Sequence, residues 1–224
     1  MTDDNTNVKK RKSKWITNMT AAQADKRLGF RTEELKAIST ARMLAEAKYK
    51  PGGMASRRPR KRYFNEANVS DFVLYIIGPI LSGFRRKTGW NVRLRREKEI
   101  ISMDGEEFVV VDLVSVAEEQ FVLMVEGKRS SLGQAERQRL LSLKDMGDKN
   151  GGGEVYGFTT TGESWRMFKY DGVSFWKTEK MDVVFDTMDD DKERWMKDYS
   201  ILVDCIYVAL SNGGIVKKDV VVRG

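Results

Sequence analysis

Two carboxylates and a lysine stand at the ends of two apolar runs near the middle of the chain. Asp112 follows Phe108 to Val111, and Glu126-Gly127-Lys128 follows Phe121 to Val125. Strands this apolar are normally buried on both faces, so charges at their ends need a chemical reason. The 224 residues include no histidine and one cysteine, which excludes histidine-based catalysis and cysteine-rich or histidine-ligated zinc sites. Chemistry in this chain would therefore use carboxylates, lysines and an oxygen-bound metal.

A β-hairpin is the element predicted to position these residues. Glu107 to Val116 and Phe121 to Lys128 have the pattern of two strands joined by a turn. Residues 126 and 128 share one face because side chains alternate along a strand with period two. With a tight turn Asp112 falls opposite Val125, and a bulge or a change of one residue in the loop would align it with Glu126. The sequence therefore predicts that the two carboxylates lie within a few ångströms of each other.

Two carboxylates at that separation require a compensating cation in an apolar setting, and paired carboxylate oxygens suit Mg²⁺ or Mn²⁺. Lys128, on the same face as Glu126, could hold a water or stabilise a developing phosphorane charge. Together they would form a minimal centre for phosphodiester cleavage. The alternative is a solvated strand end, in which Asp112 pairs with an arginine such as Arg129.

The elements around the hairpin predict an α/β domain over residues 65–224. Helical periodicity covers 69–86, 130–146 and 191–210, and strand patterns cover 92–103, 154–160 and a hairpin over 164–178. This order favours a mixed central sheet with helices on its faces. The aromatic residues of the later strands are predicted to be core, namely Trp165, Phe168, Phe175 and Trp176.

Residues 1–64 are strongly basic and are predicted to form a partly helical or disordered arm. They carry 17 Lys or Arg against 6 Asp or Glu, a net +11, whereas the remaining residues carry −4, which gives the chain its +7. Helices are predicted from Thr32 to Lys48 and from Thr20 to Gly29. Two basic clusters would contact nucleic-acid phosphates, bind a nuclear import receptor, or form only a solvated tail. They comprise Lys9, Lys10, Arg11, Lys12, Lys14, Arg57, Arg58, Arg60, Lys61 and Arg62.

The pattern of Asp112, thirteen residues and Glu126-Gly127-Lys128 resembles the PD-(D/E)XK nuclease superfamily. The run VYGFTTTGESWRMF, residues 155–168, is similar to the stretch after the catalytic strands in restriction-enzyme-like domains of fungal and oomycete proteins, Crinkler-type effectors among them. The likeness covers residues 66–180 or so. The sequence departs from the pattern twice, because Val111 stands in the place of the motif's proline and Gly127 replaces a branched apolar residue.

The resemblance implies a restriction-endonuclease-like fold and Mg²⁺- or Mn²⁺-dependent hydrolysis of DNA, with RNA as the alternative polymer. Asp112 and Glu126 would be metal ligands and Lys128 the catalytic lysine. Gln134 would lie near the site on the following helix, and the acid of the first helix would be Glu66, with Asp71 as the second candidate. Without the resemblance, Gln134 is part of a polar helix stripe and Glu66 an acid favoured at a helix start.

A second function follows from the same resemblance, because superfamily members often lose their chemistry. The chain would then be an inactive DNA-binding or protein-interaction module of the nuclear effector type. No secretory signal or bilayer-length apolar segment is visible, which predicts an intracellular protein, nuclear if eukaryotic, without membrane contact. The sequence leaves a homodimer open.

Overall fold

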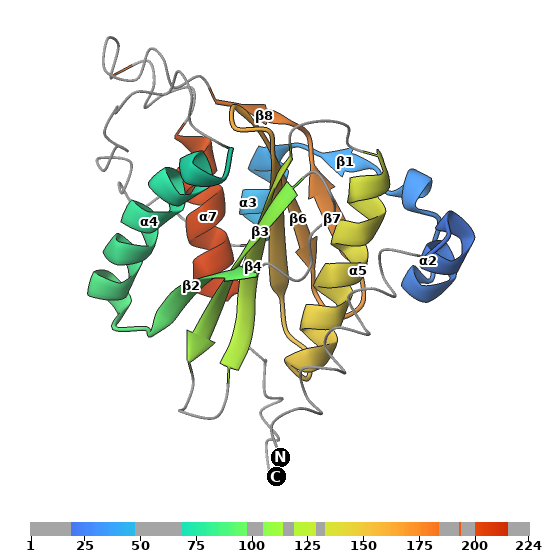
Figure 1. Cartoon of the computed structure of the whole chain (residues 1–224), viewed down its shortest axis with the longest axis horizontal. Coiled ribbons are helices and arrows are strands. Elements are labelled where there is room, and N and C mark those ends of the chain that lie inside the picture. The colour runs from blue at the N-terminus through green and yellow to red at the C-terminus, as the bar shows by residue number, and fades with distance from the viewer. Residues whose placement is uncertain are drawn as a thin grey trace.

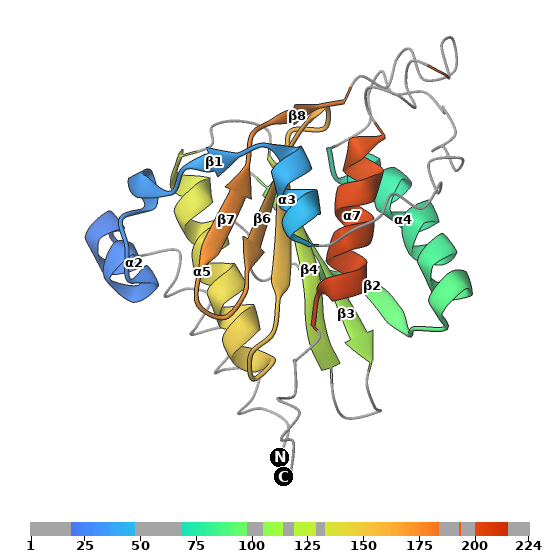
Figure 2. The ribbon, with the colours of Figure 1, turned by 180° about the vertical axis from the view of Figure 1, so that it is seen from behind.

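The computed structural model describes residues 19–47, 69–97, 105–113, 119–128, 133–183, 193 and 200–214. Within these ranges the chain forms one eight-stranded mixed sheet covered by helices on both faces (Figures 1 and 2). This confirms the predicted α/β class. No helix in the same ranges is both long and apolar enough to cross a bilayer.

The main path of the sheet runs in the order β1-β7-β6-β5-β4-β3-β2, and β8 pairs with β6 off this path. β4 pairs with β5, and β1 with β7, in parallel, and the other pairs are antiparallel. β2 therefore lies at one edge of the sheet and β1 at the other. The strands are β1 Ala37–Ile38, β2 Val92–Glu97, β3 Gly105–Leu113, β4 Glu119–Lys128, β5 Val155–Thr160, β6 Ser164–Tyr170, β7 Phe175–Thr178 and β8 Met181–Asp182.

The helices divide between the two faces of the sheet (Figures 1 and 2). α4 (Val69–Thr88), α7 (Ile201–Asn212) and α3 (Thr40–Glu46) lie on one face, and α5 (Gly133–Lys149) lies on the other with α2 (Ala21–Leu28) packed against it. Each face has its own core. Leu123 and Val125 of β4 pack on the α4–α7 side, whereas Met124 packs beneath α5.

The parallel pair β4 and β5 is joined through α5, which packs closely on the sheet. A Cβ added at Gly157 of β5 would lie 3.1 Å from the side chain of Leu143 and 3.2 Å from that of Arg139. A side chain at this position would press on both of these residues, so glycine favours the close approach of α5. The predicted aromatic core is confirmed for Trp165 and Phe168, both 1% exposed, and for buried Phe175, while Trp176 is half-buried.

The N-terminal residues that the structure describes, 19–47, belong to the domain, so the predicted boundary at residue 64 is wrong for them. β1 adds to the free edge of β7, and α3 packs against α7. Thr20 caps the start of α2, where its hydroxyl accepts from the backbone N–H of Gln23, and Gly29 (φ 82°) caps its end, as predicted. The predicted helix over 32–48 is instead a 3₁₀ turn (Thr32–Glu34), β1 and α3.

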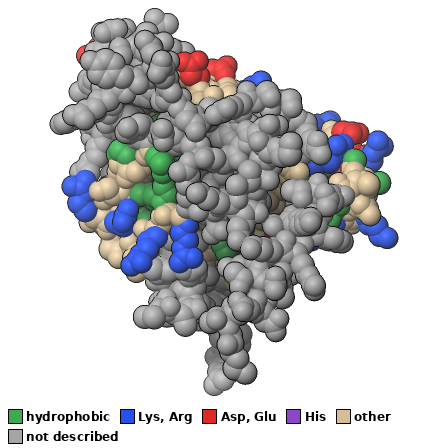
Figure 3. All heavy atoms as spheres, in the orientation of Figure 1, with side chains coloured by type: hydrophobic (Ala, Val, Ile, Leu, Met, Phe, Trp, Pro, Cys, Tyr) green, Lys and Arg blue, Asp and Glu red, His purple; other side chains and the backbone are tan. Residues whose placement is uncertain are grey.

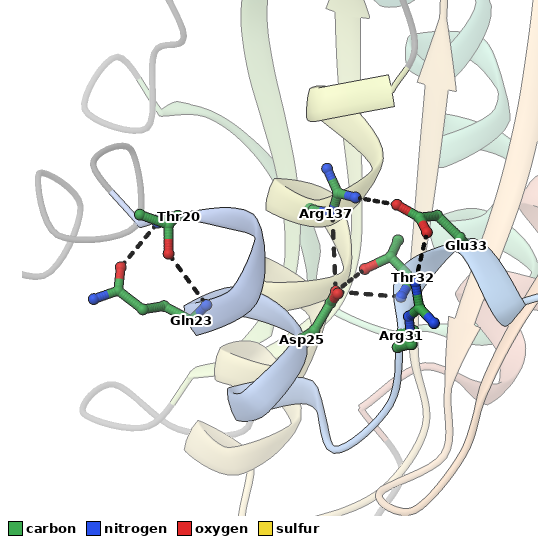
Figure 4. Close-up of polar contacts among 7 residues, drawn as sticks. All are labelled: Thr20, Gln23, Asp25, Arg31, Thr32, Glu33 and Arg137. Carbon is green, nitrogen blue, oxygen red and sulfur yellow. Dashed lines mark hydrogen bonds and ion pairs between the residues drawn. The ribbon is translucent and has the colours of Figure 1, made fainter.

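Polar contacts hold this segment to α5 (Figure 4). Arg137 of α5 donates to Glu33 at 2.8 Å and lies 3.9 Å from Asp25 of α2. Asp25 also accepts from the hydroxyl of Thr32 at 2.7 Å and from its backbone N–H at 3.2 Å. The hydroxyl hydrogen bond from Thr32 is the main reason that the pKa of Asp25 lies below its ordinary value. Thr32 therefore stabilises a turn and an ionised carboxylate, and does not cap a helix.

Candidate functional site

A row of polar residues crosses the sheet where the parallel strands β4 and β5 end. Glu107 of β3 is the register partner of Glu126 of β4, which is the partner of Thr159 of β5. Thr159 is in turn the partner of Arg166 of β6. Facing antiparallel residues have Cα atoms about 5 Å apart, so two glutamates are brought together in the backbone. The carboxyl ends of neighbouring parallel strands are a common place for a binding site.

The face on which this row lies follows from the residues next to it. Met124 packs beneath α5, and Gly157 of β5 faces the side chains of α5. Positions 126, 128 and 159 share that face because each is an even number of residues from Met124 or Gly157. The row therefore lies on the α5 side of the sheet, where the chain passes from β4 towards the start of α5.

The first two turns of α5 add a compact group of charges to this end of the sheet. Glu136 accepts from Lys177 of β7 at 2.5 Å, and it lies 3.5 Å from Arg166. All three side chains are largely buried, with 13–19% of each exposed. Arg139, one turn further along α5, is 1% exposed. Glu136 therefore pairs with two largely buried cations from β6 and β7 beside the two glutamate positions.

The pairing of Asp112 with Glu126 that the sequence predicts is wrong in this register. Asp112 pairs with Gln120, and Val125 pairs with Phe108. Gln120 and Glu126 are six residues apart on β4, so Asp112 is roughly 20 Å from Glu126 along the strands. β3 and β4 continue pairing down to Leu113 and Glu119, whereas the prediction assumed a turn that begins later. Asp112 is thus at the opposite end of the hairpin from the triplet.

Of the other predicted site residues, the structure describes the backbone positions of Lys128 and Gln134. Lys128 ends β4 two positions after Glu126, opposite Gly105, and Gln134 is the second residue of α5. Both are therefore in the elements that border the row. Glu66 lies outside the described residues, as do the ten basic residues of the clusters at 9–14 and 57–62.

Sequence reasoning missed Glu107, and a signal for it was present. Glu107 closes the acidic stretch Asp104-Gly105-Glu106-Glu107 at the start of the apolar run that Asp112 ends. In an antiparallel hairpin the start of the first strand faces the end of the second, so Glu107 is the acid expected opposite Glu126. The register adds Glu97 of β2 as the partner of Glu107 on its other side.

The residue types in the row are ones that could hold a divalent metal. Glu107 and Glu126 bring two carboxylates to facing positions, and carboxylate oxygens are the ligands that Mg²⁺ and Mn²⁺ prefer. Among the side chains that the structure describes, no three acidic or cysteine side chains form a metal-binding group. The side chains of Glu107 and Glu126 are not among those described.

Comparison with known proteins identifies no relative. No protein-family model matches the chain, and no curated protein and no solved structure matches it either.

Proposed function

We propose that this chain is a metal-dependent nuclease of the restriction-endonuclease-like type that hydrolyses phosphodiester bonds of DNA. The observation that carries the proposal is the register that sets Glu107 opposite Glu126, two positions before Lys128 and at the end of two parallel strands. The proposal replaces Asp112 by Glu107 as the partner carboxylate.

In this proposal Glu107 and Glu126 hold Mg²⁺ or Mn²⁺. The bound ion supplies Lewis-acid stabilisation of the charge that develops on the phosphodiester. Lys128 orients the attacking water and balances negative charge on the same face. Gln134, in the first turn of α5, is a candidate to orient the water or the substrate.

The basic clusters at 9–14 and 57–62 are proposed to contact DNA, an import receptor, or both, which would place the protein in a nucleus if its source is eukaryotic. Their combined charge fits sequence-blind contacts with phosphates.

Cleavage of supercoiled plasmid by the full-length protein with Mg²⁺ or Mn²⁺ tests the proposal. We expect nicking that requires the ion and that falls at least about 100-fold in Glu126→Gln and in Lys128→Met. Glu179→Gln, an exposed glutamate after β7, is the matched control and should cleave at the wild-type rate. Equal cleavage by all four proteins, or cleavage that persists in EDTA, would sink the proposal. No cleavage by the wild type, with metal bound, would favour the inactive DNA-binding module instead.

A further inference from the structure

A cluster of exposed basic side chains lies in the body of the domain, apart from the N-terminal arm. It comprises Arg85, Arg86 and Lys87 in the last turn of α4, and Arg93 on the edge strand β2, and we call it the α4–β2 patch. Figure 3 shows Lys and Arg side chains gathered over this end of α4 and β2, and none of the described side chains among them is acidic. No ion pair links these four residues to an acid in the described part of the chain.

The connection between α4 and β2 holds the patch in a fixed shape. Gly89, with φ 74°, ends the helix, and its N–H donates to the carbonyl oxygen of Arg85 at 2.9 Å. The Thr88 hydroxyl donates to the carbonyl of Phe84 and accepts from the N–H of Trp90. Trp90 then packs edge-on against the buried ring of Phe84 at 5.6 Å. The basic side chains are thus presented on an ordered turn.

Arg93 is the member of the patch that shares a face of the sheet with the glutamate row, whereas α4 with Arg85, Arg86 and Lys87 lies on the other face at the same edge. Val92 is buried and Leu94 packs on the α4–α7 core, so Arg93 projects from the other face of β2, the face that carries the row. Arg93 is four positions along the strands and two strands across from Glu126. At about 3.4 Å per residue and 4.8 Å per strand this separation is roughly 17 Å. That length corresponds to about five base-pair steps of a duplex.

Among the described residues, the patch offers charged side chains without a fully exposed aromatic side chain beside them, which suits contact with the backbone of a double-stranded polymer. Proteins that hold single strands combine basic grooves with exposed aromatic side chains on which bases stack. In the described part of the chain the one large hydrophobic side chain that is exposed is Val173, so no such platform is present there. Basic side chains that contact only phosphates bind the backbone without regard to base sequence. We infer that the α4–β2 patch binds the phosphate backbone of duplex DNA and leads the polymer to the Glu107–Glu126 row.

This inference rests on the proposed nuclease for its polymer, but binding can be measured without catalysis. The test uses full-length protein in EDTA, a fluorescent duplex of about two helical turns, and anisotropy over a range of salt concentrations. The patch variant combines Arg85→Gln, Arg86→Gln, Lys87→Gln and Arg93→Gln. The control variant makes the same change in net charge within residues 26–42, through Lys26→Gln, Arg31→Gln, Lys36→Gln and Arg42→Gln, all of them exposed.

The expected loss follows from the helix geometry. Residues 85, 86 and 87 point about 100° apart around the helix, so we expect about two contacts with one phosphate strand from the whole patch. Two lost contacts reduce the magnitude of the logarithmic salt slope by about 1.8 and weaken binding about 60-fold at 0.1 M salt. The control variant should lose less than about threefold, because Arg31 and Arg42 already pair with Glu33 and Glu46.

Circular dichroism and thermal unfolding of both variants establish that they are folded. Equal losses in the two variants would mean a net-charge effect alone and would overturn the inference. So would an unchanged patch variant, tighter binding of a single strand than of the duplex, or a patch-dependent affinity for anionic vesicles with none for the duplex. If duplex binding depends on the patch while the wild type never cleaves, the inferred DNA-binding role of the patch is supported and the proposed nuclease activity is wrong.

Discussion

Substitution of Glu107 should abolish tight binding of a divalent metal, whereas substitution of Asp112 should not. The two glutamates face each other across β3 and β4, with Cα atoms about 5 Å apart. Asp112 is roughly 20 Å from Glu126. Mn²⁺ binding to Glu107→Gln and Asp112→Asn, measured by calorimetry or by electron paramagnetic resonance of the free ion, therefore distinguishes the two candidate partners of Glu126.

The expected magnitudes follow from these separations. A unit charge 20 Å from a divalent ion contributes about 0.4 kcal/mol in water, and salt at 0.1 M reduces this below about 0.1 kcal/mol. Asp112→Asn should therefore change the Mn²⁺ affinity less than twofold. Loss of a direct ligand should cost more than the 10- to 100-fold typical of residues that only orient ligands. We expect at least about a 100-fold loss in Glu107→Gln.

The stability of the metal-free protein gives an independent readout. Two ionised carboxylates 5 Å apart repel by up to about 3 kcal/mol at an effective dielectric constant of 20. Glu107→Gln should therefore raise the melting temperature in EDTA, and saturating Mn²⁺ should reverse the order by stabilising the wild type. A large loss of affinity in Asp112→Asn with none in Glu107→Gln would refute the register argument. Small and equal losses of Mn²⁺ affinity in both variants would show that the metal does not bind at this row.

Three further predictions concern the packing around the site, each read from denaturant unfolding. Gly213→Ala should destabilise the protein by about 1–3 kcal/mol, because the new Cβ would lie 2.5 Å from a backbone carbonyl oxygen of β4. Thr32→Val should destabilise at neutral pH, and the difference from wild type should shrink as the pH falls through the lowered folded pKa of Asp25, because protonation removes the ionised acceptor in the wild type too. Glu136→Gln should cost about 1–3 kcal/mol by leaving two largely buried cations without their acid, whereas Glu46→Gln, in an exposed pair, should cost less than about 0.5 kcal/mol.

The hairpin could be predicted from sequence, but its register could not. Apolar runs and intervening polar residues identify β3 and β4 because burial on both faces demands such runs. Phe108 to Val111 is apolar at every position, so no alternation of polar and apolar residues marks which residue faces which. A tight turn was the simplest assumption, and five residues separate the observed strands. A tight turn would bring Asp112 towards Glu126, whereas the observed register brings Glu107 there.

The basic composition of the N-terminal segment predicts an arm because a net charge carries no information about which of its residues pack on the domain. Residues 1–64 are basic overall, yet α2 directs Ala24 and Leu28 onto α5 and leaves its polar side chains outside. Its remaining attachment is made by ion pairs, such as Arg27 with Asp145. Pairs between residues more than a hundred positions apart leave no local periodicity. Basic residues that predict an arm therefore also form ion pairs that attach this segment to the domain.

The face of the sheet on which Glu126 and Lys128 lie depends on one extra residue in β4. Val110 pairs with Leu123 and Val111 with Phe121, which leaves Val122 as a bulge, and Val122 and Leu123 pack in the same core. The side-chain amide of Asn150 accepts from the N–H of Phe121 and donates to its carbonyl, both at 2.8 Å, where the pairing with β5 has not yet begun. Without the bulge Glu126 would face Glu106 on the α4–α7 side, away from α5. A bulge and one amide, neither of them part of a recognisable motif, thus decide which acids meet.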